Sequence, residues 1–140
     1  MINFFRFHRN PESLDNHKIA QYIDAIIQYE FDCGPEIAMP IIKRHAGYAS
    51  HYAITYLKGR WIEAEPFIMK DPYCAHNYAR LVIKDRWIEA EPYIIKEYKA
   101  MIYYAQDVIK GRWYEAEEII KNTGSYWDWK WYCNCLNIND

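Results

Sequence analysis

The clearest pattern of apolar and polar residues along the chain is a segment that returns every 26 residues. Residues 58–68 read Lys-Gly-Arg-Trp-Ile-Glu-Ala-Glu-Pro-Phe-Ile, and residues 84–94 and 110–120 repeat this order with few changes. We call each of these segments a tryptophan box. A fixed period of this size is typical of repeat proteins, in which each copy buries its apolar side against the next. The pattern therefore predicts an all-α fold, a short α-solenoid of stacked helix pairs with a 26-residue period.

Each copy is expected to contain two short helices, helix A and helix B. In the first full copy, helix A is expected at about residues 61–70. Pro66 would fall in or near its first turn, where a missing backbone donor costs little. Helix B is expected at about residues 73–84, and Gly59 and Gly111 are expected to end such helices. Helices this short do not persist alone, so stacking must hold them.

The two ends of the chain depart from the pattern, as terminal repeats should, because each lacks a neighbour on one side. The first copy has no Arg-Trp pair, and a further helix is expected before it at about residues 17–30. The last helix B is expected at residues 126–135. The prediction is one helical repeat domain, residues 1–140, with a lead-in and capping helix (1–34), a degenerate repeat (35–57), two repeats (58–83 and 84–109), a capping repeat (110–135) and a tail (136–140).

Comparison of the two full copies separates two faces of helix B. Of 26 positions, 14 are identical, and those in helix B are Tyr78, Ala79, Val82 and Ile83, which share one helical face. We expect this face to be core. The opposite face, here called the variable face, changes in every copy. Its residues are Ser50, His51, Ile54 and Thr55, then His76, Asn77, Arg80 and Leu81, then Ile102, Tyr103, Gln106 and Asp107.

Varied positions on a regular scaffold are where repeat proteins place partner contacts, although a merely solvated face is the alternative. The C-terminal helix is a second candidate, because it is aromatic on all sides and aromatic residues are enriched in binding hot spots. Trp127 and Trp131 are expected on its buried side. The candidate partner-binding residues are His51, Ile54, His76, Asn77, Arg80, Tyr103, Gln106, Trp129 and Tyr132.

The charged residues of the tryptophan box favour a structural role. Arg60 lies three residues before Glu63, and an Arg–Glu ladder from copy to copy would fix the register of the stack. The box tryptophans are expected to pack into each successive interface. Acid–base catalysis by Glu63 and Glu65 is not favoured, because residues two apart on a helix point to different sides. An active site also does not normally recur three times.

Composition excludes several classes of function. A net charge of -2 argues against a non-specific binder of phosphate backbones. The sequence has no apolar run of about 18 residues and no signal peptide, so a cytoplasmic protein with no membrane partner is expected. The cysteines are expected as reduced thiols. No metal spacing, phosphate loop or nucleophile motif is present, so no cofactor, no metal and no enzymatic activity are expected.

The box at residues 83–94, followed by Tyr104, Ala105, Val108 and Ile109, resembles a short helical repeat found in proteins of bacteriophages and large viruses. The resemblance covers about residues 38–120. It implies a viral origin, a location in the host cytoplasm and a role against host factors, but no assigned activity or functional residue. The last copy has Glu118 where the repeat has proline, which fits a cap.

These observations lead to three hypotheses of function. The first is a non-enzymatic protein–protein interaction module, in the viral case a phage-encoded inhibitor of a host defence or regulatory protein. The second is a viral structural or assembly protein, with the edge of the stack as the contact in a small oligomer. The third is single-stranded nucleic-acid binding through the repeated aromatics, against which the near-neutral charge counts.

Overall fold

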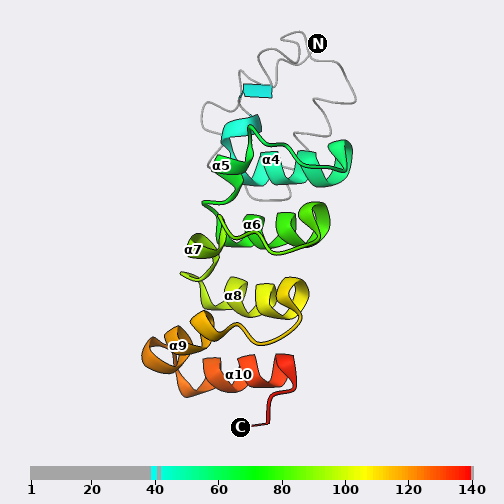
Figure 1. The fold of residues 1–140 in the computed structure, drawn as a ribbon. Coiled ribbons are helices and arrows are strands. Elements are labelled where there is room, and N and C mark those ends of the chain that lie inside the picture. The colour runs from blue at the N-terminus through cyan, green and yellow to red at the C-terminus, as the bar shows by residue number, and fades with distance from the viewer. Residues whose placement is uncertain (1–38, 41, 140) are drawn as a thin grey trace. The chain divides into compact units, whose positions relative to one another are not determined.

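The computed structural model describes residues 39, 40 and 42–139. All regular secondary structure in these residues is helical, which confirms the all-α class (Figure 1). The chain divides into two compact units, Met1–Ile68 and Met69–Asp140, which we call unit 1 and unit 2 and describe separately. The division into one repeat domain stays a prediction. The helix predicted at residues 17–30 lies outside the described residues.

Unit 1 contains α4 (Ala46–Tyr52), the π-helical segment η2 (Ala53–Leu57) and α5 (Glu65–Ile68). The ring of His45 caps α4 by accepting a hydrogen bond from the backbone N–H of Tyr48. Helix α5 packs against α4. Among the residues of this unit that the structure describes, the buried apolar ones are Ile42, Tyr48, Ala49, Ala53, Ala64 and Ile68.

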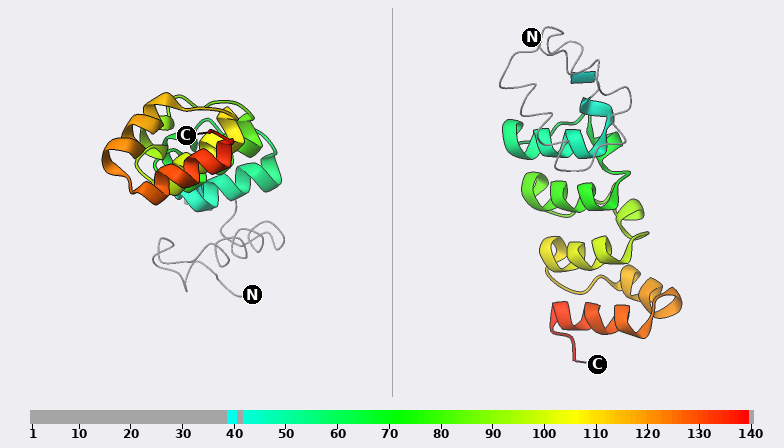
Figure 2. Two further views of the ribbon diagram at one scale, coloured as in Figure 1. Left: turned by 90° about the horizontal axis from the view of Figure 1, so that it is seen from below. Right: turned by 180° about the vertical axis from the view of Figure 1, so that it is seen from behind.

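Unit 2 contains three helical layers that lie side by side in the order α6, α8, α10 (Figure 2). Helix α7 contacts both α6 and α8, and α9 contacts α10. The short box helices therefore bridge or flank the longer helices. The elements are α6 (Pro72–Tyr78), η3 (Ala79–Ile83), α7 (Glu91–Ile94), α8 (Tyr98–Tyr104), η4 (Ala105–Ile109), α9 (Tyr114–Thr123) and α10 (Tyr126–Leu136).

Helix A is shorter than predicted in both full copies, because proline interrupts it. Helices α5 and α7 have four residues each, and Pro92 is the second residue of α7. A turn precedes α7, in which the N–H of Ala90 donates to the carbonyl of Trp87 (3.0 Å). Since proline has no N–H, it cannot extend the helix backwards over this turn. Glu118 stands at this position in the last copy, and α9 there runs unbroken for 10 residues.

Helix B ends in a way that the sequence did not predict. Its last five residues are π-helical in three successive copies, and a lysine with positive φ follows each time. These lysines are Lys58 (φ 49°), Lys84 (φ 60°) and Lys110 (φ 57°). Gly59 and Gly111, which were expected to end these helices, come one residue after the left-handed lysine and have no positive φ themselves. A side chain in this conformation costs about 1–2 kcal/mol, which the surrounding structure must offset.

The retained face of helix B is core at its first two positions, as predicted, whereas Val82 and Ile83 and the equivalent Val108 and Ile109 are only half-buried. Tyr78 and Ala79 are fully buried, and the equivalent residues of the next copy, Tyr104 and Ala105, are fully buried as well. The alanines allow the neighbouring helix to approach closely, since α6 and α8 contact each other directly. The tyrosines are polar, so their burial requires hydrogen-bond partners.

Candidate functional site

The arginine of each tryptophan box makes a bidentate ion pair within its own box. Both hydrogen bonds from Arg86 to Glu91 measure 2.8 Å. The same pair joins Arg60 to Glu65 and Arg112 to Glu117. The predicted pairing of Arg60 with Glu63 is therefore wrong, and so is a ladder built from these ion pairs across copies. Residues 60–64 form a turn rather than a helix, and the turn brings the arginine to the glutamate five residues on.

The paired glutamate also receives the buried tyrosine of the following helix B. The hydroxyl of Tyr104 donates to Glu91 (3.0 Å) and accepts from the backbone N–H of Trp87 (2.7 Å). Burial raises the pKa of Tyr104, so the phenol keeps the proton that it donates. The last copy repeats this arrangement with Arg112, Trp113, Glu117 and Tyr132. We call the four residues of each copy the Arg–Glu–Tyr–Trp group.

The indole of each box in unit 2 contacts the helix before the box. The ring of Trp87 lies 5.1 Å from that of Tyr78, and Trp113 lies 5.2 Å from Tyr104. Both tryptophans are 2% exposed. Each box is therefore joined to the preceding helix B by its indole and to the following helix B by its backbone N–H. The prediction that Trp87 and Trp113 pack between successive copies is confirmed.

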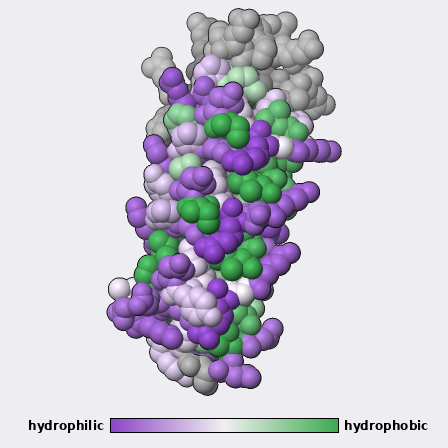
Figure 3. Space-filling view, in the orientation of Figure 1, coloured by the Kyte–Doolittle hydropathy of each residue, from purple (hydrophilic) through white to green (hydrophobic). Residues whose placement is uncertain are grey.

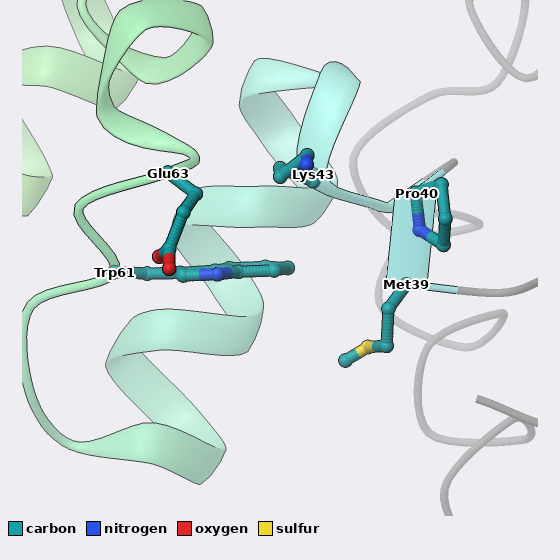
Figure 4. A pocket seen from close by; sticks show the side chains of 5 residues that line it. All are labelled: Met39, Pro40, Lys43, Trp61 and Glu63. Atoms are coloured by element: carbon teal, nitrogen blue, oxygen red, sulfur yellow. The ribbon is translucent and has the colours of Figure 1, made fainter. Parts of the chain in front are cut away.

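The box of unit 1 borders a shallow hollow. Trp61 is half-buried, and its ring lies 5.3 Å from that of Tyr52. The hollow combines apolar side chains with one ammonium and one carboxylate. The residues that line it are Met39, Pro40, Lys43, Trp61 and Glu63 (Figure 4).

The variable face of unit 2 holds a second group of interacting side chains. His76 is 6% exposed, and its Nε2 lies 2.9 Å from a carboxylate oxygen of Asp107. Burial lowers the pKa of His76, while the hydrogen bond with Asp107 opposes this shift. The imidazole is then neutral near pH 7 and donates its Nε2 proton to the carboxylate.

An aromatic row extends from this histidine across three helices. The ring of Tyr103 stacks on His76 at 5.9 Å, and Trp131 meets Tyr103 edge-on at 5.6 Å. We call His76, Tyr103, Asp107 and Trp131 the variable-face cluster. Its exposed rim includes Tyr103 itself at 38% and Tyr73 at 42%. Arg80 is also exposed, and its guanidinium is held by the side chain of Asn77 (3.2 Å).

The structure brings together some of the predicted contact residues and separates others. His76, Asn77, Arg80 and Tyr103 lie in or beside the variable-face cluster, and Gln106 is exposed one residue before Asp107. His51 and Ile54 are half-buried in unit 1. Asp107 and Trp131 were missed as site residues. Asp107 and His76 both occupy variable-face positions, and His76 is the only histidine in the sequence of unit 2. A possible pairing of these two side chains was the signal that could have identified Asp107.

The C-terminal helix corrects two predictions. Tyr132 is fully buried with its hydroxyl in use, so it is no surface contact. Trp127, predicted as buried, is 72% exposed. The cause is a shift of register: the buried tyrosine follows the box tryptophan by 17 residues in Trp87–Tyr104 but by 19 residues in Trp113–Tyr132. Trp129 is half-buried and stacks on Tyr132 at 5.7 Å.

The described residues offer little for catalysis. Nowhere among them do three His, Cys, Asp or Glu side chains gather as a metal site would require. Burial raises the pKa of the Cys135 thiol, which disfavours the reactive thiolate. Within residues 39–139 as described, no helix has the length and apolar character to cross a bilayer.

Comparison with protein-family models, with curated proteins and with solved structures gives no match to this chain.

Proposed function

We propose that this chain is a non-enzymatic protein–protein interaction module, built as a short α-solenoid with a 26-residue period, whose partner docks on the variable-face cluster. The observation that carries the proposal is the aromatic row from His76 through Tyr103 to Trp131. It joins three helices on the face that the copies do not share. The shared residues, in contrast, are largely engaged in holding the helices together.

The repeat architecture is supported by the recurrence of one Arg–Glu–Tyr–Trp group in unit 2. The two sets of hydrogen bonds match in donor, acceptor and length to within 0.1 Å for the backbone contact (2.7 and 2.8 Å). Two unrelated segments would not place four side chains alike. A solenoid in which each box fastens two successive helices accounts for this recurrence.

The variable-face cluster has the properties of a binding hot spot. Tyrosine, tryptophan and arginine are the residues most enriched in such spots. Tyr103 is held between His76 and Trp131, so docking would immobilise few additional rotamers. Figure 3 shows apolar side chains alternating with polar ones over the face that it presents.

A protein partner suits this face better than a single nucleic-acid strand. Among the described residues, Arg80 lies close enough to lower the pKa of His76, and the cluster itself contains the carboxylate of Asp107. A strand-binding groove would need several cations along the phosphates. The viral resemblance makes a host defence or regulatory protein the proposed partner, and the chain its inhibitor.

Affinity purification from host cells tests the proposal, with the wild-type chain compared with the double variant Arg80→Ala, Tyr103→Ala. The expected result is loss of the captured protein at least tenfold, with little change in melting temperature, because both side chains are exposed. Trp127→Ala is the matched control, since it removes an equally aromatic, exposed side chain away from the cluster. Equal capture by the double variant and the wild type would show that the face is wrong.

A further inference from the structure

The indole of Trp61 is less covered than its counterparts in the later boxes. Trp61 is half-buried, whereas Trp87 and Trp113 are each 2% exposed. Its ring contacts that of Tyr52 in α4, with 5.3 Å between the ring centres, and this contact restrains the indole. The uncovered part of the indole forms a wall of the hollow in unit 1 (Figure 4). Aromatic walls of this kind are a common feature of small-molecule sites.

The helix A residues that border the hollow differ from those of the two following copies. One period later, Glu65 stands at the position of Met39, and Met69 stands at the position of Lys43. Ile95 takes the place of Met69 in the copy after that. These two copies thus have an apolar side chain where the first has an ammonium group. Stacking of the copies does not require a lysine at this position, so its charge calls for another explanation.

Lys43 and Glu63 bring opposite charges to the hollow without neutralising each other. Lys43 is half-buried and Glu63 is exposed, and neither forms an ion pair with another residue that the structure describes. Figure 4 shows the indole edge-on, with the side chain of Lys43 and the methylene groups of Glu63 above it. The neighbouring cation Arg60 is engaged by Glu65, and Arg44 does not line the hollow. One ammonium and one carboxylate are therefore available to a ligand.

The size and the charges of the hollow restrict the class of ligand. Its volume is about 240 Å³, which is below the roughly 300–1,000 Å³ of pockets for drug-sized molecules. A small anion would be repelled by Glu63 and a small cation by Lys43, whereas a small zwitterion meets an opposite charge at both groups. An aromatic ring on that zwitterion can also stack on the indole of Trp61.

We propose that the hollow of unit 1 binds a free aromatic α-amino acid. The carboxylate of the ligand pairs with the ammonium of Lys43, its ammonium pairs with the carboxylate of Glu63, and its ring stacks on Trp61. A residue inside a polypeptide carries neither backbone charge, so the ligand is a free amino acid rather than an internal peptide segment. The site shares no residue with the variable-face cluster, so it does not depend on the proposed partner.

The test is titration of the full chain with L-phenylalanine, followed by the NMR signal of the Trp61 indole N–H. The wild type is expected to show a saturable shift of this signal at millimolar ligand. L-phenylalaninamide, which lacks the carboxylate, and N-acetyl-L-phenylalanine, which lacks the ammonium, should each bind at least about threefold more weakly. The signals of the buried indoles of Trp87 and Trp113 should not move, and they serve as internal controls.

Two variants identify the groups that hold the ligand. Lys43→Met, which introduces the residue of the next copy, should weaken L-phenylalanine at least about threefold without weakening the amide, which has no carboxylate to lose. Glu63→Gln should weaken L-phenylalanine without weakening the N-acetyl derivative. Glu89→Gln makes the same change in the next box, where the indole is buried, and this matched control should bind like the wild type.

A Trp61 signal that does not move in the wild type would overturn the proposal. So would equal binding of L-phenylalanine and its two derivatives, or wild-type affinity in Lys43→Met or Glu63→Gln. A shift confined to the signals of Trp87 or Trp113 would place the ligand elsewhere and would also overturn it. The two derivatives are tested on the wild-type chain, so this comparison holds even where a variant fails to fold.

Discussion

The copy at residues 84–109 and the last copy keep the same Arg–Glu–Tyr–Trp group but differ in the helices around it. In the earlier copy, Pro92 limits helix A to four residues, and helix B ends in a π-helical segment. In the last copy, helix A is 10 residues long, and α10 stays α-helical to its left-handed cap at Asn137. Helix lengths therefore adapt to the local sequence, whereas the hydrogen-bonded group does not change.

The two copies also differ in what covers the buried tyrosine of helix B. The ring of Tyr104 contacts Trp113 from the following box. Tyr132 has no following box, and Trp129 of the same helix stacks on it instead, with the ammonium of Lys121 4.2 Å from the indole. Trp129 thus supplies from within α10 the indole that the next copy would provide.

The largest effect is expected from Trp87→Ala. The indole is 2% exposed and joins the box to Tyr78, so its loss should lower the free energy of unfolding by about 3–5 kcal/mol in urea denaturation. Trp127→Ala at the exposed start of α10 is the control and should change it by less than about 0.5 kcal/mol. Similar losses from the two variants would contradict the placement of the indoles.

The variants Tyr104→Phe and Tyr132→Phe compare the two copies directly. Each variant leaves the buried backbone N–H of one box tryptophan without its acceptor. Each should therefore lower the free energy of unfolding by about 1–3 kcal/mol. Because the two groups match, the two costs should agree within about 0.5 kcal/mol. A cost in only one copy would show that the groups are alike in geometry but not in energy.

Trp129→Ala should lower the free energy of unfolding. The loss of the aromatic pair should contribute about 0.5–1.5 kcal/mol, in addition to the effect of the apolar area that is no longer buried. Trp129→Phe, which keeps a ring over Tyr132, should recover part of this. Amide exchange can locate the effect, since faster exchange should appear in α10 and leave α6 as it was. Equal acceleration in both helices would mean that Trp129 is not a local cap.

A smaller effect of opposite sign is expected from Lys84→Gly and Lys110→Gly. Both lysines have positive φ, which glycine adopts without strain, so each change should stabilise the protein by up to about 1 kcal/mol. Lys96→Gly is the control at an exposed lysine without positive φ, and it should not stabilise. Thermal melting would distinguish these variants.

The smallest effect concerns pH. Burial lowers the pKa of His76 in the folded state, so the unfolded chain binds more protons in the window below the ordinary pKa of about 6.5. The contribution to stability is therefore full above that pH and falls as pH drops through it. The last copy contains no histidine and shares none of this dependence. His76→Gln should flatten the stability profile between about pH 7 and pH 5.

The sequence was sufficient to predict that Tyr78, Tyr104 and the alanines beside them are buried and that Trp87 and Trp113 pack between copies, although Ile102 and His76 of the variable face are buried as well. Internal comparison of the copies did this, because a retained helical face must be buried for a shared reason. The partner of Arg60 was mispredicted since Glu63 is three residues away, a spacing that pairs side chains only within a helix. Segment 60–64 is a turn, and the turn selects Glu65.

Two other features had no signal in the sequence. The register of α10 could not be aligned, because residues after 120 contain no tryptophan box with which to compare it. The π-helical ends of helix B could not be predicted either, because Val82 and Ile83 are equally compatible with an α-helix. The candidate site was half predicted: Tyr103 and His76 lie on the variable face, but Trp131 reaches them only through the shifted register.

The central claim is that each tryptophan box is fastened to the following helix by the hydroxyl of a buried tyrosine. Native-state hydrogen exchange of the Trp87 and Trp113 amides tests it most directly. We expect both amides to exchange only by global unfolding, with Tyr104→Phe accelerating Trp87 alone and Tyr132→Phe accelerating Trp113 alone. Rapid exchange of these amides in the wild type, or no change in the variants, would contradict the account.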